Sequence, residues 1–291
     1  MTPRFDTTRI GDNDIHYHLA DYTDPWRKGE GTPPTLLLYP GYCRTIEFWR
    51  AWVPLLGRHY RVLRMDARGY GYSSKPEPGA TFTVESLAGD ALGLMDHLGI
   101  DQVHWVGEST GGAVGLQAAV LHPTRIQSIS LCNTTARMRT ETPGNYAVGE
   151  SDQAAALEKF GVAEWCRMTL ANRMDIASAA PGLGEWVADQ MARTPTHIAI
   201  AAFKLFSKID LFPLLRQVQA PVLLICGDKC TESRKKIMTE MRDAIPTAQL
   251  VYLDGFDYGL HYVAPDKVVA EVRQFLHAFF PQPQFTLTKM M

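Results

Sequence analysis

A serine flanked by two glycines is the strongest chemical signal in this sequence of 291 residues. Gly107 stands two residues before Ser109, and Gly111 stands two residues after it. Glycines at these positions permit the strained strand-to-helix turn that lifts a serine hydroxyl clear of a sheet. The alternative is a glycine-rich turn with an incidental serine, but an apolar run before the motif and a helix-like segment after it favour the first interpretation. We therefore predict that Ser109 is a catalytic nucleophile.

A serine hydroxyl is a weak nucleophile at neutral pH and needs an oxyanion hole as well as a base. One donor is the backbone N–H of Thr110, directly after the serine. The second is expected from the loop after an earlier apolar run, where Gly41 lets the chain turn and Tyr42 offers its N–H. The other interpretation of Pro40-Gly41 is an ordinary turn at the end of a strand.

The composition of the chain limits the classes of protein to which it can belong. An apolar content of 46% in a chain of this length is enough to bury the core of one large domain. The formal net charge of −2, with mixed signs throughout, gives no indication of a nucleic-acid partner. We see neither a signal peptide nor an apolar run that approaches the ~18 residues of a membrane span.

The cysteines form an odd and scattered set: Cys43, Cys132, Cys166, Cys226 and Cys230. Such a set favours reduced thiols in a cytoplasmic protein over a disulfide framework. We expect a small-molecule substrate, no cofactor, no metal, and neither a nucleic acid nor a membrane as partner. The sequence leaves the oligomeric state open, and a homodimer is one option.

Short apolar runs that alternate with helix-like segments must position these residues. The runs are Thr35–Tyr39, Tyr60–Met65, Gln102–Val106, Ile126–Cys132, Val222–Cys226 and Gln249–Leu253. Runs of this length are typical of strands buried on both faces, and their alternation with helices predicts an α/β fold with a mostly parallel, doubly wound sheet. We also expect an N-terminal hairpin that turns at residues 11–13, a helix capped by Thr83, and a closing helix after Pro265.

Residues 137–212 interrupt this alternation, because they lack strand-like runs and are rich in helix formers. We predict that they form a helical lid over the carboxyl edge of the sheet, where substrates bind in open α/β folds. Residues 1–136 and 213–291 would then form the core.

Several segments together resemble the α/β-hydrolase fold superfamily over nearly the whole chain. "PGYCRTIEFW" is similar to a loop that usually reads His-Gly, with Pro40 in place of the histidine. "MDARGYGYSSKPE" resembles an Asp-x-Arg-Gly-x-Gly-x-Ser segment, "GESTGG" resembles the nucleophile elbow, and "LCNTTARMRT" is similar to the 3-oxoadipate enol-lactonase branch. The resemblance implies an α/β-hydrolase fold with a lid and a Ser-His-Asp triad, but this fold hosts many chemistries.

The acid that the resemblance implies is missing. Family members end the strand that resembles "VLLICGDKC" in Gly-x-x-Asp, whereas this chain has Cys230 at the position of the acid. A thiol orients an imidazole only weakly unless it is ionised, and Asp228 is an alternative two residues earlier. Cys230 is equally well interpreted as a small buried apolar residue. A metal site at Cys226 and Cys230 is disfavoured, because two further ligands at suitable spacing are absent.

The base also departs from the family pattern, which places a Gly-His pair so that a proline follows seven residues after the histidine. Counting back from Pro265 leads to Tyr258, preceded by Asp257, and the nearest histidine is His261. Either His261 has taken over proton transfer, or Tyr258 has replaced the base and the usual triad is lost. We favour His261, because a phenol with a pKa near ~10 is a poor base at neutral pH. The alternative is that His261 is a partly buried residue that lines the pocket.

Three hypotheses for function follow. The first is a cytoplasmic serine hydrolase that acts on an ester or lactone of a small, largely apolar carboxylic acid. Ser109 would attack the carbonyl, the amides of Tyr42 and Thr110 would hold the oxyanion, and His261 would shuttle protons with support from Cys230 or Asp228. The second is a lyase, isomerase or decarboxylase in which Ser109 and Tyr258 surround an enolate. The third is a catalytically silent ligand-binding protein.

Overall fold

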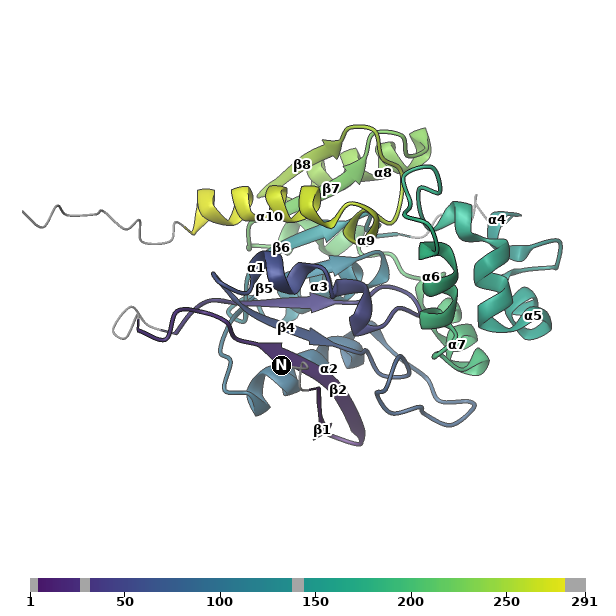
Figure 1. The fold of residues 1–291 in the computed structure, drawn as a ribbon, viewed down its shortest axis with the longest axis horizontal. Coiled ribbons are helices and arrows are strands. Elements are labelled where there is room, and N and C mark those ends of the chain that lie inside the picture. The colour runs from purple at the N-terminus through teal and green to yellow at the C-terminus, as the bar shows by residue number, and fades with distance from the viewer. Residues whose placement is uncertain (1–4, 27–31, 138–143, 281–291) are drawn as a thin grey trace, which may run out of the picture.

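A sheet of eight strands lies at the centre of the computed structural model, which describes residues 5–26, 32–137 and 144–280 (Figure 1). The strands are β1 (Asp6–Ile10), β2 (Asn13–Ala20), β3 (Thr35–Tyr39), β4 (Arg61–Met65), β5 (Val103–Glu108), β6 (Ile126–Cys132), β7 (Val222–Gly227) and β8 (Ala248–Leu253). Their order in the sheet is β1-β2-β4-β3-β5-β6-β7-β8. β1 and β2 form the predicted antiparallel hairpin, and all pairs from β4 to β8 are parallel. The predicted fold class is confirmed.

Helices cover both faces of this sheet. They are η1 (Ile46–Trp49), α1 (Trp52–Leu56), α2 (Val84–His97), α3 (Thr110–Leu121), η3 (Phe212–Gln217), α8 (Glu232–Ala244), α9 (Leu260–Val263) and α10 (Pro265–Phe279). Residues of α2, α3 and α8 share one apolar core, and residues of α1 and α10 share the other. Alternate residues of β3 enter the two cores, with Leu37 on one side and Leu36 and Leu38 on the other. A strand buried on both faces must be apolar throughout, which explains the continuous run in the sequence.

Two helix boundaries follow directly from the sequence. The Thr83 side chain accepts a hydrogen bond from the Ser86 N–H (3.0 Å), and the Ser86 hydroxyl accepts one from the Thr83 N–H (3.1 Å). This capping box satisfies donors that the first turn of α2 leaves free. α10 begins at Pro265, whose fixed φ and missing N–H suit the first position of a helix.

The segment between β6 and β7 is helical. It contains α4 (Gly144–Ala147), α5 (Gln153–Met168), η2 (Leu170–Asn172), α6 (Leu183–Met191) and α7 (Thr196–Phe206), and the structure describes no strand in it apart from a bridge between Arg137 and Asp210. Hydrogen bonds join this segment to the loop after β3: Tyr42 Oη donates to the carbonyl of Ala199 (2.6 Å), and Thr45 Oγ1 donates to Gln190 Oε1 (2.9 Å). Figure 1 shows α5, α6 and α7 together at one end of the sheet. The division into core and lid at residues 137 and 212 stays a prediction.

No helix in the described parts of the chain has both the length and the apolar character of a membrane span.

Candidate active site

Ser109 occupies a strained turn between β5 and α3. Its φ of 51° and ψ of −122° are unfavourable for a residue with a side chain. The flanking glycines make the turn possible, because both sites are too crowded for a side chain. A Cβ on Gly107 would lie 2.6 Å from the Cα of Gly112, and one on Gly111 would lie 2.4 Å from the carbonyl oxygen of Pro40. The structure thus has Ser109 at the sharp strand-to-helix turn that the sequence predicts.

The two amides predicted for the oxyanion hole belong to segments that meet beside this turn. Thr110 is the first residue of α3, so its N–H points away from the helix. A Cβ on Gly41 would lie 2.9 Å from the carbonyl oxygen of Glu108, so the loop after β3 passes closely over the end of β5. Within the described chain, the N–H groups of Tyr42 and Thr110 have no hydrogen-bond partner. Both donors are therefore free to bind a substrate oxygen.

The residue that precedes the serine belongs to a buried ion pair. The Glu108 side chain is fully buried and forms an ion pair with Arg44, which is also buried. Burial disfavours the charged guanidinium, but the Glu108 carboxylate raises the pKa of Arg44 well above its ordinary value. Arg44 Nη2 also donates to the hydroxyl of Tyr262 (3.5 Å). We did not predict this pair, although a carboxylate next to the nucleophile at the end of an apolar strand was a visible signal.

Tyr258 lies against two guanidinium groups. Its ring is 4.5 Å from the guanidinium carbon of Arg234 and 5.9 Å from that of Arg44, measured to the ring centre. Burial, reinforced by the charge of Glu108, raises the pKa of the phenol above its ordinary value. Tyr258 therefore stays protonated at neutral pH and can donate a hydrogen bond, but it cannot act as a ready base.

His261 is enclosed by aromatic rings. It is 1% exposed, and its ring centre lies 4.6 Å from that of Trp49 and 4.8 Å from that of Tyr262. Trp52 Nε1 donates to the carbonyl oxygen of His261 (2.7 Å), which fixes the start of α9. Burial, with a smaller contribution from Arg44, lowers the pKa of the imidazole well below its ordinary value. The ring is therefore neutral near pH 7, as a base must be.

The structure does not join His261 to Ser109 by a hydrogen bond. Among the residues it describes, neither ring nitrogen of His261 has any hydrogen-bond partner. A buried polar atom without a partner is uncommon in folded proteins and is often explained by a catalytic role or by an ordered water. The role of His261 as base stays a prediction.

The two candidates for the acid have other partners. Cys230 Sγ lies 3.0 Å from Cys226 Sγ. Asp228 Oδ1 accepts hydrogen bonds from the N–H groups of Gly255 (2.7 Å) and Phe256 (3.2 Å), so it holds the loop after β8. In the described chain, neither residue forms a hydrogen bond with an imidazole. A role for Cys230 in catalysis stays a prediction.

Arg173 is a buried arginine that no local sequence pattern marks as functional. Its guanidinium carbon lies 3.9 Å from the ring centre of Trp165 and 4.9 Å from that of Tyr146. Nε donates to Thr169 Oγ1 (2.9 Å), whereas Nη2 is buried without a partner. Arg173 forms no ion pair with any residue that the structure describes. Tyr262 Oη donates to its carbonyl oxygen (2.7 Å), which connects Arg173 to the neighbourhood of Arg44.

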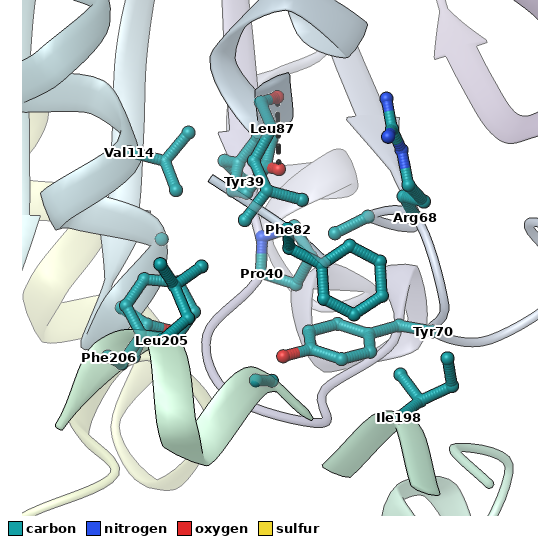
Figure 2. Close-up of a pocket in the computed structure, with 14 residues that line it drawn as sticks. Tyr39, Pro40, Arg68, Tyr70, Phe82, Leu87, Val114, Ile198, Leu205 and Phe206 are labelled. Atoms are coloured by element: carbon teal, nitrogen blue, oxygen red, sulfur yellow. Dashed lines mark hydrogen bonds between the residues drawn. The ribbon is translucent and has the colours of Figure 1, made fainter. Parts of the chain in front are cut away.

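An apolar hollow lies next to Thr110 and the start of the loop after β3. It measures about 340 Å³, part of which is open to solvent. Figure 2 shows Tyr70 and Phe82 from the core around the same hollow as Ile198, Leu205 and Phe206 of α7. Arg68 also lines it, but its guanidinium is held by the Asp90 carboxylate at 2.6 and 2.9 Å. The hollow therefore presents an apolar lining next to a proposed oxyanion donor.

Within the described residues, no cluster of three or more histidine, cysteine, aspartate or glutamate side chains is arranged to bind a metal ion.

Comparisons with known proteins agree with this architecture. The family model for the alpha/beta hydrolase fold matches residues 34–165. A protein of Stutzerimonas stutzeri named as a carbamate hydrolase, RutD, is 29% identical over 257 residues, which cover 85% of this chain and 89% of that protein. The 3-oxoadipate enol-lactonase 1 of Acinetobacter baylyi is 28% identical over 183 residues, or 62% of this chain and 65% of that enzyme. The crystal structure of an enol-lactonase from Burkholderia xenovorans LB400 has a TM-score of 0.81 and 26% identity, and the match covers 93% of this chain and 99% of that one.

Proposed function

The chain belongs to the α/β-hydrolase superfamily, and on that premise we propose that it is a serine hydrolase that cleaves an ester or lactone bond of a small carboxylic acid. One observation carries the proposal: the strained turn at Ser109 lies beside two free backbone amides. A serine on such a turn is exposed for attack, and amides in this arrangement stabilise the negative charge of a tetrahedral intermediate. The names of the relatives, a carbamate hydrolase and an enol-lactonase, support hydrolysis in general terms.

In the proposed reaction, Ser109 Oγ attacks the carbonyl carbon and the amides of Tyr42 and Thr110 hold the resulting oxyanion. His261 takes the serine proton and passes it to the leaving oxygen, and water then releases the acid. His261 is suited to this step because its imidazole is neutral near pH 7 and both nitrogens lack partners among the described residues. A bridging water or a small shift of α9 has to connect it to Ser109, as hydrogen bonds at active sites are often loose before substrate binds.

The surroundings of the serine support a substrate with one apolar and one anionic part. The apolar part would contact the apolar residues that line the hollow beside Thr110. The anionic part would bind a cationic side chain. Arg44 and Arg173 are both buried, but only Arg44 has a carboxylate partner among the described residues. An unpaired buried charge is costly, so Arg173 is suited to bind a second carboxylate of the substrate.

The geometry also supports a second candidate function, because the serine has no hydrogen-bonded imidazole in the described chain. The protonated phenol of Tyr258 and the guanidinium of Arg44 would then stabilise an enolate in a lyase, isomerase or decarboxylase reaction. The five cysteines, none of them in a disulfide, support the expected cytoplasmic location.

Matched pairs of p-nitrophenyl esters and lactones, with and without a distal carboxylate, test the proposal. We expect a higher kcat/KM for the anionic member of each pair. Arg173→Gln should reduce kcat/KM for that member by about 10- to 100-fold, since a hydrogen bond to a charged group contributes about 1.5–3 kcal/mol. The matched control is Arg167→Gln, because Arg167 lies on the exposed side of the helical segment and pairs with Glu185.

Three outcomes would contradict parts of this account. Equal losses on neutral and anionic substrates would mean that Arg173 is structural. Hydrolysis that does not depend on the distal carboxylate would remove the anionic part of the proposal. Failure to hydrolyse any member of the panel, combined with tight binding of an enolate analogue, would favour the second candidate.

A further inference from the structure

Two buried thiols are in contact at the end of β7, where the superfamily places its triad acid. Cys226 and Cys230 have their sulfur atoms 3.0 Å apart, and Cys230 is 3% exposed. A turn closed by the hydrogen bond from the Cys230 N–H to the Gly227 carbonyl (3.3 Å) brings the two residues together. The other three cysteines also lie in the described parts of the chain, and none of them has a cysteine sulfur in contact.

The two thiols differ in character. The two thiols are within hydrogen-bond distance, and either sulfur can be the donor. Donation by Cys226, together with the charges of Arg234 and Lys235, lowers the pKa of Cys230 below its ordinary value, although burial and the Asp257 carboxylate act in the opposite direction. Cys230 also directly precedes α8, whose N-cap is Thr231, and a helix N-terminus favours a thiolate. The hydrogen bond to Cys230 and burial raise the pKa of Cys226. The position of Cys230 at the start of α8, next to Arg234, thus favours Cys230 as the nucleophile and Cys226 as the thiol that stays protonated.

Cys230 lies just below the surface, because its neighbours Lys229 and Thr231 are both exposed. A molecule as small as hydrogen peroxide therefore needs only a local fluctuation of this turn to reach the sulfur. A disulfide requires a sulfur–sulfur distance of about 2.05 Å, so the two sulfurs have to approach by about 1 Å.

We propose that Cys226 and Cys230 form an intramolecular disulfide when hydrogen peroxide reaches this turn. The Cys230 thiolate attacks one peroxide oxygen, the O–O bond breaks, and the products are a sulfenic acid and hydroxide, which takes up a proton to give water. The Cys226 sulfur then attacks the Cys230 sulfur, loses its proton, and displaces the hydroxyl group as a second water. Two thiols lose two electrons in total, and one peroxide is reduced to two waters.

The bridge would change the candidate site at the position of the acid. It removes the ionisable group of residue 230 and fixes the turn that contacts the loop after β8, where the Lys229 N–H donates to the Phe256 carbonyl (2.9 Å). This inference does not depend on the proposed hydrolysis, because the disulfide forms whether or not Ser109 is a nucleophile.

Peptide mapping of the full-length protein tests the inference directly. Trypsin cleaves after Arg216, Lys229 and Arg234, so Cys226 lies in the peptide 217–229 and Cys230 in the peptide 230–234. Each peptide contains one cysteine, and a linked pair identifies the bridge without ambiguity. The protein is treated with peroxide, its free thiols are alkylated under denaturing conditions, and it is digested without reductant. We expect most of the Cys226 to be recovered in the disulfide-linked pair of peptides. Cys43, Cys132 and Cys166 should remain alkylated, and dithiothreitol should separate the linked peptides.

Two variants sharpen the result. Cys226→Ser should leave Cys230 as a sulfenic acid that dimedone traps, because the resolving thiol is gone. Cys132→Ser removes a buried cysteine without a thiol partner and should leave the linked pair unchanged. The inference is wrong if Cys230 of the wild-type protein advances to sulfinic acid while Cys226 stays reduced. It is also wrong if other cysteines are oxidised at peroxide doses that leave both thiols intact.

Discussion

The two halves of the candidate site are built in different ways. The half formed by β5, α3 and the loop after β3 keeps the superfamily pattern, with Ser109 on a strained turn beside two free amides. The half formed by the loops after β7 and β8 has Cys230 and Tyr258 where the resemblance to the superfamily predicts an acid and a base. The first half depends on backbone geometry that glycines make possible, whereas the second depends on side chains that must reach one another. The fold preserves backbone geometry when side chains change, whereas a single substitution can disrupt a catalytic set of side chains.

The two halves also differ in the charges of their buried side chains. The first half contributes the buried carboxylate of Glu108, whereas the second contributes a protonated Tyr258, which lies against the cation Arg234 of α8. Arg44, from the loop after β3, lies between them and pairs with Glu108. Whether the second half still takes part in proton transfer decides between the two candidate functions.

The largest expected effect is that of Ser109→Ala. If the first half works as proposed, removing the hydroxyl should reduce kcat/KM for ester or lactone substrates by about 10⁴-fold or more, as the loss of a triad nucleophile does. Steady-state kinetics of the wild-type protein and the variant measure this effect. Retention of most of the activity would mean that no covalent intermediate forms on this serine.

The second prediction compares the two candidates for proton transfer. His261→Ala should reduce kcat/KM by about 10²- to 10⁴-fold, the usual contribution of a general base, whereas Tyr258→Phe should cost much less. Because burial lowers the pKa of His261, the rate should fall on the acid side of that pKa, at a pH below about 6.5, and remain level from there through neutrality. If Tyr258→Phe is the more damaging change, the second half has lost its base and the non-hydrolytic candidate takes the lead.

The third prediction concerns the ion pair that lies between the halves. Arg44→Met leaves the Glu108 carboxylate buried without its cation, which should lower the free energy of unfolding by about 3–5 kcal/mol. The matched control is Arg9→Met, since Arg9 pairs with Asp14 on the surface and its loss should cost about 1 kcal/mol or less. Urea denaturation measures both. Similar values for the two variants would mean that the buried pair contributes no more than a surface pair.

The smallest expected effect is that of Cys230→Asp. Cys230 contacts Cys226, and the described chain gives it no imidazole partner, so an aspartate there should change kcat/KM by less than about tenfold, or 1.4 kcal/mol. Combining it with Tyr258→His gives both positions the residues that the resemblance to the superfamily predicts. Because the acid and the base then occur together, this double variant should hydrolyse esters faster than either single variant. Equal rates for all three would show that restoring these two residues does not rebuild the second half.

The sequence predicted what depends on local pattern. The strands differ from the predicted runs by one or two residues at most, and Thr83 and Pro265 begin helices as expected. The turn at Ser109 was predictable because the glycines that permit it are neighbours in the chain. These features need no knowledge of distant contacts.

Long-range contacts explain what the sequence did not predict. The His261 ring packs against Trp49, and its carbonyl oxygen accepts a hydrogen bond from Trp52. Both tryptophans are more than two hundred positions away, so no local pattern could predict that the ring is buried. The same holds for Arg173, whose lack of a carboxylate partner depends on how the helical segment packs. The ion pair of Glu108 could have been predicted, because a charged residue at the end of an apolar strand needs a buried partner.

Labelling with a fluorophosphonate tests whether Ser109 is an activated nucleophile. The reagent reacts with serines that are both exposed and activated, and the amides of Tyr42 and Thr110 would hold its phosphoryl oxygen. Intact-mass and peptide analysis should detect one adduct per chain, located at Ser109, and none in Ser109→Ala. An unlabelled wild-type protein, or an adduct at another residue, would contradict the account.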